Sequence, residues 1–106
     1  MQVIMKQEVY RYQLRTINNG WLGDVILTSD GCFFARTDWG NFNYHWDSAG
    51  DIREFILRID GCYFSGKMLI STDERSKKLE MKCYKFSEKI LPALKEAIKK
   101  ELESEA

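Results

Sequence analysis

The ten residues 38–47, DWGNFNYHWD, hold four aromatic rings, two asparagines and the single histidine of the chain. Such crowding is found in ligand cages, in base-stacking platforms and in strands whose inner side fills a core. Phe42, Tyr44 and Trp46 alternate with polar residues, so a strand would turn all three rings to one face. We therefore expect these rings in the core, where each contributes about 1.5–3 kcal/mol. Trp39 precedes the alternation, and we expect it to stay partly exposed.

Polar side chains occupy the opposite face of the same pattern. Asn41, Asn43, His45 and Asp47 alternate with the rings, and an upstream segment alternates in the same way with Arg11, Gln13 and Arg15 outward. Guanidinium and carboxamide groups suit a protein edge, an acidic loop or a phosphate, although an ordinary hydrated sheet face has the same composition. Because Arg and Trp dominate interface energetics, we expect partner contacts from this set: Arg11, Arg15, Arg36, Trp39, Asn41, Asn43 and His45.

The sequence supports a catalytic site less well than a binding surface. A divalent-metal or acid/base site would gather four acidic residues, but each has a simpler role as turn former, strand end, helix cap or capping partner: Asp38, Asp47, Asp51 and Glu54. A cysteine–histidine nucleophile would use His45, yet no glycine-rich or helix-start context activates a thiol. Phosphate-binding loops and zinc-protease motifs are absent from the sequence. We expect no catalytic residues and a protein that is not an enzyme.

The three cysteines, Cys32, Cys62 and Cys83, are an odd number with wide spacing, and the short apolar start MQVIM does not form a secretory signal. This predicts reduced, mostly buried thiols rather than disulfides. Together with His45 they would make a Cys3His zinc site, but structural zinc sites usually take ligands from closely spaced pairs. We expect no metal ligands and no cofactor.

The composition predicts one globular domain, 1–106, with 44% hydrophobic and 30% charged residues. Sixteen basic side chains balance sixteen acidic ones, so no overall field attracts nucleic acid or anionic lipid. The apolar runs are too short for a membrane span. We expect a cytoplasmic location.

The amino-terminal half predicts a β-meander over residues 1–47. Strands are expected at 9–17, 24–29, 32–37 and 41–46, and the first has Tyr10, Tyr12 and Leu14 on its inner face. An Asn-Asn-Gly segment at 18–20 and Asp30-Gly31 supply turns between them.

Helical periodicity follows, with short helices over 51–70. Asp51 is the expected N-cap and Glu54 its capping-box partner, ahead of an apolar stripe of Ile52, Phe55, Ile56 and Ile59. Gly61 is expected to end this helix, and a second short helix covers 62–69. Residues 71–78 are expected to form a solvated loop.

The carboxyl-terminal part predicts a long helix over 87–103 that begins at Ser87 as N-cap and has Pro92 in its first turns. Residues 79–86 fit both a strand and a helix, and we favour an extended segment. The last eight residues are expected to fray. The whole pattern predicts an α+β fold, a four-stranded antiparallel β-meander packed on one face by two or three α-helices.

Residues 38–68 resemble a pattern in small, mostly uncharacterised proteins of bacteriophages and prophages. In that pattern an acidic-Trp-Gly-Asn-aromatic strand precedes a Trp, a Gly-containing turn, an "FL..L" helix and a Tyr-aromatic-x-x-Lys segment. The matching positions are Asp38, Trp39, Gly40, Asn41, Trp46, Phe55, Tyr63 and Lys67. The resemblance implies a phage accessory protein of a β-meander-plus-helices type in a bacterial cytoplasm, and it implies no known reaction.

These observations lead us to expect a phage-encoded non-catalytic binding protein. The most concrete version of this expectation is an anti-CRISPR-like inhibitor. It would contact a host bacterial protein or ribonucleoprotein complex that acts in defence or in nucleic-acid processing. The alternative is a nucleic-acid or nucleotide-binding module with the arginines on phosphate and Trp39 stacking. A third class, a small hydrolase, would need a divalent metal at the acidic residues.

Overall fold

The computed structural model of the chain describes residues 7–47, 49–70 and 76–105. Four antiparallel strands form one sheet in sequence order, β1 to β4, which confirms the predicted meander. Their bounds are Val9–Arg15, Trp21–Thr28, Cys32–Thr37 and Gly40–His45.

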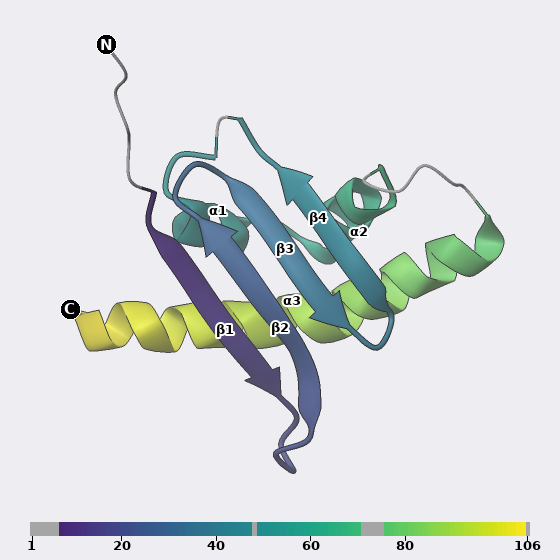
Figure 1. Cartoon of the computed structure of the whole chain (residues 1–106), viewed down its shortest axis with the longest axis horizontal. Coiled ribbons are helices and arrows are strands. Elements are labelled where there is room, and N and C mark those ends of the chain that lie inside the picture. Colours follow the sequence, from purple (N-terminus) through teal and green to yellow (C-terminus); the bar gives the residue numbers. More distant parts are fainter. Residues whose placement is uncertain (1–6, 48, 71–75, 106) are drawn as a thin grey trace.

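All three helices cover the same face of this sheet, and the longest runs across its back (Figure 1). They are α1 (Ile52–Arg58), α2 (Gly61–Ile70) and α3 (Lys77–Glu105). The predicted α+β class is therefore confirmed. Within the described part of the chain, no helix has the length and apolar character needed to cross a membrane.

Aromatic rings build the core between sheet and helices. Phe33 makes edge-on contacts with Trp46, Phe64 and Phe86, at centroid distances of 6.3, 5.3 and 6.4 Å. Phe42 and Trp46 are buried, and Tyr44 is half-buried. Alternation therefore placed these rings correctly on the inner face.

The helix that follows the sheet begins at the predicted N-cap, Asp51, but it ends differently. Asp51 Oδ1 accepts hydrogen bonds from the backbone N–H of Arg53 and of Glu54, at 3.0 and 3.4 Å. Ile59 is extended (φ −84°, ψ 152°) and closes α1. Gly61 does not end α1 but begins α2, because Asp60 caps the new helix with a 2.8 Å bond from the backbone N–H of Tyr63.

The expectation of an extended segment at 79–86 is wrong, and so is the start of the last helix at Ser87. Ser76 is the actual N-cap, since its Oγ accepts from the backbone N–H of Leu79 at 3.1 Å. The boundary 87–103 is replaced by Lys77–Glu105, and Ser87 is buried within the helix. Packing decides this, because Cys83 and Phe86 have helical spacing and are buried against the core. Residues 71–75 of the predicted loop lie outside the described residues.

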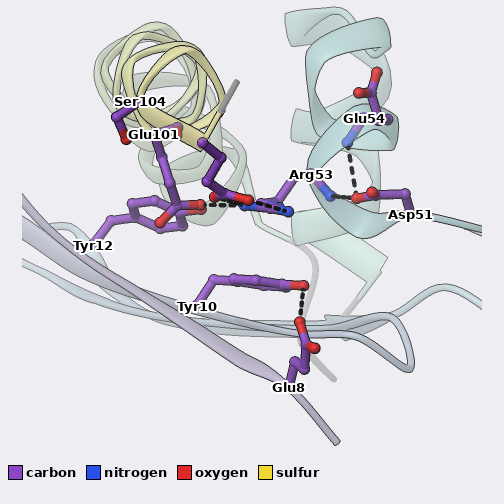
Figure 2. A network of polar contacts seen from close by, with 9 residues as sticks. Glu8, Tyr10, Tyr12, Asp51, Arg53, Glu54, Glu101 and Ser104 are labelled. Carbon is purple, nitrogen blue, oxygen red and sulfur yellow. Dashed lines mark hydrogen bonds and ion pairs between the residues drawn. The ribbon is translucent and has the colours of Figure 1, made fainter.

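The fraying expected for the last residues is also wrong, because α3 continues to Glu105 and a polar network holds this end (Figure 2). Arg53 of α1 donates to Glu101 at 2.8 Å and to Glu105 at 2.6 Å, and its guanidinium lies 4.4 Å from the centroid of the Tyr10 ring. Tyr12 of β1 donates to the same Glu101 carboxylate at 2.8 Å. One end of the helical layer is thereby tied to the edge of the sheet.

Candidate functional site

The sheet face that the helices leave uncovered is the surface from which we build the candidate site. We call it the open face. It is defined by two neighbouring rows of directly paired residues that run across all four strands: Arg11, Ile26, Phe34 and Asn43 in one row, and Gln13, Asp24, Arg36 and Asn41 in the other. Side chains in such rows contact one another across the strands. The rows therefore form one continuous surface.

A hollow of about 500 Å³ lies in this face. Its lining joins charged and carboxamide side chains to apolar ones: Arg11, Asp24, Ile26, Phe34, Ala35, Arg36, Asn41, Phe42 and Asn43. A largely apolar floor with a few convergent polar groups is typical of a recognition site.

The centre of the open face is apolar. Phe34 leaves 48% of its surface exposed, and its direct partner Ile26 is half-buried. Our sequence reasoning did not identify either residue as part of the site. The available signal was the pair Phe33-Phe34, since adjacent strand residues point to opposite faces and one ring must point outward. An apolar centre with a polar rim is the arrangement found in protein interfaces.

A charged group with fixed geometry borders this centre. Arg36 Nη2 donates to Asp24 Oδ2 at 2.6 Å, and the guanidinium lies 5.8 Å from the centroid of the Trp21 ring. Trp21 Nε1 also donates to Asp24 at 3.4 Å. The hydrogen bond from Arg36 is the main reason that the pKa of Asp24 lies below its usual value. Asp24 thus orients Arg36, whose side chain stays 71% exposed.

Trp21 is another residue that our sequence reasoning missed. The register of β1 and β2 shifts between Leu14 and Arg15, so that Leu14 pairs with Gly23 and Arg15 with Trp21. A bulge of this kind adds a residue to one strand and changes which side chains share a face. Trp21 thereby contacts the charged pair on the open face, where 36% of its surface is exposed.

The structure brings together four of the seven residues predicted to contact a partner. Arg11, Arg36, Asn41 and Asn43 all line the hollow. The other three do not line it: Arg15 is exposed at the end of β1, Trp39 packs against the core from the β3–β4 turn, and His45 lies at the far end of β4. Trp39 is partly exposed, as expected.

His45 lies among groups from the β2–β3 turn and from the residues after β4. Its Nε2 is 2.9 Å from the carbonyl oxygen of Asp30, and its Nδ1 is 3.1 Å from Asp47 Oδ1. Cys32, its direct partner across the strands, has its thiol close by. This end of the sheet is a second polar cluster, separate from the hollow.

The acidic metal site and the Cys3His site considered from the sequence do not form among the described residues. Asp38, Asp47, Asp51 and Glu54 do not gather into a metal-binding group there. Of the cysteines in the hypothetical Cys3His site, only Cys32 lies with His45. All three cysteines are free, as expected. The expectation that they are mostly buried fails for Cys62, which is exposed, while Cys32 is half-buried. Cys83 is buried, and this burial raises the pKa of its thiol.

Comparison with curated proteins and with solved structures gave no significant match. A model of a phage family matches residues 1–82, which include the whole sheet, α1, α2 and the first turns of α3. The matched range also contains residues 38–68, so the phage origin implied by their resemblance is confirmed. The chain therefore belongs to this phage family.

Proposed function

We propose that the open face binds a macromolecule of the bacterial host without catalysis, and that the protein is an inhibitor of a host defence or nucleic-acid-processing complex, of the anti-CRISPR-like kind. The observation that carries this proposal is the exposed Phe34 ring beside Ile26, at the centre of a face rimmed by polar side chains. Exposed apolar surface with such a rim is a feature of protein-binding sites. Membership of a phage family supports a role inside the infected cell.

The chemistry of the hollow indicates the kind of partner surface. Among the residues that the structure describes, the Arg11 side chain forms no hydrogen bond or ion pair, and its charge helps to lower the pKa of Asp24. Its guanidinium is therefore available to a carboxylate or a carbonyl group of a partner. Asn41 and Asn43 offer both donors and acceptors on the other side of the hollow, on β4. We infer that the partner presents an apolar side chain to Phe34 and an acidic group to Arg11.

The alternative is a nucleic-acid surface with Phe34 as a stacking ring, since an exposed ring on a sheet can stack on a base. Asp24 argues against nucleic acid, because its carboxylate pairs with Arg36 and places a negative charge in the same hollow, where it would repel a phosphate. The equal numbers of basic and acidic residues also provide no general attraction to phosphate. We therefore favour a protein partner.

Phage plating tests the function. A host with an active defence system restricts a sensitive phage, and expression of the protein is expected to restore plating. Phe34→Ser should abolish this rescue, because it removes the apolar centre. Met81→Ser is the matched control, since Met81 is an equally exposed apolar residue, 54% against 48%, on the opposite, helical side of the molecule. Rescue by Phe34→Ser equal to that of the unchanged protein would contradict the proposal.

Binding measurements separate the two classes of partner. Tagged protein is used to capture host components, and the affinity of each purified candidate is then measured for the Phe34→Ser and Met81→Ser variants. We expect an affinity loss of at least about tenfold for Phe34→Ser alone. Replacing both Arg11 and Arg15 with Ala should leave the salt dependence of a protein complex shallow, whereas a steep dependence that this double variant flattens would indicate phosphate contacts. That outcome would replace the protein partner with nucleic acid.

A further inference from the structure

We propose that Asp30, Cys32 and His45 form a binding site for a divalent cation that prefers thiolate and imidazole ligands, with Zn²⁺ as the best fit. The site lies where the β2–β3 turn meets the end of β4, outside the hollow of the open face. It does not depend on the proposed function. The sequence expectation of no metal ligands rested on spacing along the chain, whereas these groups meet across the sheet.

The geometry of the three side chains supports coordination. Cys32 and His45 are direct partners in the β3–β4 ladder, and one potential ligand atom from each of the three residues lies within 4.8 Å of the other two. Ligand atoms on one tetrahedral zinc ion are roughly 3.3–3.5 Å apart, given bonds of about 2.0–2.3 Å. Small side-chain rotations would therefore bring the three groups into coordination.

The kinds of ligand select the metal. A thiolate and an imidazole favour zinc and similar transition metals, whereas Mg²⁺ and Ca²⁺ prefer sites made of oxygen atoms. The carboxylate of Asp30 completes a set of three protein ligands, and a water molecule would supply the fourth position of a tetrahedral site.

The backbone around the site is held in place independently of any metal. Gly31 has φ +101°, its N–H donates to the carbonyl of Thr28 at 3.0 Å, and its carbonyl accepts from the N–H of Trp46 at 2.9 Å. The N–H of Cys32 donates to Thr28 Oγ1 at 3.1 Å. The turn is thus fixed against the end of β4. Metal binding would therefore cost less conformational entropy.

The surroundings of His45 offer a second partner for a metal-bound imidazole. Both ring nitrogens face oxygen atoms, Nε2 the carbonyl of Asp30 at 2.9 Å and Nδ1 the carboxylate of Asp47 at 3.1 Å. A neutral imidazole carries one N–H and can donate to only one of them. Metal binding would require the ring to turn Nε2 away from the Asp30 carbonyl oxygen, with Nδ1–H donating to Asp47. A carboxylate on the other ring nitrogen is the usual second partner of a zinc-bound histidine.

Titration of the reduced, full-length chain with Co²⁺ tests this site. One equivalent of Co²⁺ should produce a thiolate-to-cobalt charge-transfer band together with tetrahedral visible absorption, and Zn²⁺ should displace it. Cys32→Ser should abolish the charge-transfer band. Cys62→Ser is the matched control, because Cys62 is an exposed cysteine outside the cluster, and it should leave the spectrum and the affinity unchanged.

Two further variants keep the test decisive if Cys32→Ser folds poorly. His45→Gln and Asp30→Asn retain the thiol, and each should weaken Zn²⁺ binding by at least about tenfold in competition with a chelating dye, with far-ultraviolet circular dichroism to verify folding. Absence of a charge-transfer band in the unchanged protein would overturn the proposal. So would a band that persists in Cys32→Ser and disappears in Cys62→Ser.

Discussion

Arg53 and Glu101 are 48 positions apart in the chain, yet Arg53 Nη1 donates to Glu101 Oε1 at 2.8 Å. The contact joins the first turn of α1 to the end of α3, and 11% of the arginine side chain is exposed. Hydrogen bonds to Glu105 and Glu101 raise the pKa of Arg53, so the guanidinium stays charged over the whole accessible pH range. Figure 2 shows that Tyr12 reaches the same glutamate from β1.

Replacing Arg53 with Met should lower the free energy of unfolding by about 2–3 kcal/mol. The reason is that two carboxylates and the face of the Tyr10 ring lose a cation that is largely withdrawn from water. Urea unfolding measures the change. Arg58→Met serves as the control, because Arg58 is exposed in the last turn of the same helix, and should change stability by less than about 0.5 kcal/mol. Equal losses in the two variants would show that the network contributes nothing specific.

Tyr12 should make stability fall at alkaline pH. Burial, with the hydrogen bond to Glu101, raises the pKa of its phenol above the ordinary value. In the unfolded chain the Tyr12 phenol ionises near pH 10, whereas in the folded chain it keeps its proton. Its contribution to the free energy of unfolding is therefore complete below pH 10 and is lost above it, by about 1.4 kcal/mol per pH unit.

The Tyr12→Phe variant lacks this loss, so its stability deficit should shrink between pH 9 and 11. Urea unfolding at several pH values checks this. Tyr84→Phe is the control, since Tyr84 is 58% exposed on α3, and its curve should run parallel to that of the unchanged protein. A deficit for Tyr12→Phe that stays constant over this pH range would contradict the prediction.

Gly31 should not tolerate a side chain. Its φ of +101° is unfavourable for other residues, and a Cβ placed there would lie 2.2 Å from the carbonyl oxygen of Trp46. Gly31→Ala is expected to cost about 2–4 kcal/mol in chemical unfolding. The control is Gly61→Ala, where a Cβ meets no atom within 4 Å and the position is helical; it should be neutral or stabilising by up to about 1 kcal/mol. Similar effects at both glycines would refute the argument.

Ser87 offers a stabilising substitution. It is 3% exposed within α3, and its Oγ has no hydrogen-bond partner among the described residues. Ser87→Ala removes an unpaired hydroxyl and improves helix propensity, so we expect a gain of about 1 kcal/mol and a higher Tm. Ser65→Ala in α2, a half-buried helical serine, measures the propensity part alone and should gain less. A loss of stability in Ser87→Ala would indicate that this hydroxyl is hydrogen-bonded in solution.

Local chemistry was enough to predict several features of this protein. Two-residue alternation separated Phe42 and Trp46 from Asn41 and Asn43, because a strand turns consecutive side chains to opposite faces. Asp51 was identifiable as an N-cap, since its carboxylate bonds to N–H groups only two and three residues away. Interactions over such short distances along the chain need no knowledge of the fold.

Tertiary packing decided the features that local patterns left open or predicted wrongly. Residues 79–86 satisfy both a strand and a helix pattern, and they are helical because Cys83 and Phe86 fill the core between α3 and its neighbours. For a related reason, the sequence did not reveal the centre of the open face. Phe34 and Ile26 are as apolar as core residues, and only the position of the helices leaves them uncovered. The meeting of Cys32 with His45 likewise follows from strand register, which long-range pairing sets and spacing along the chain does not.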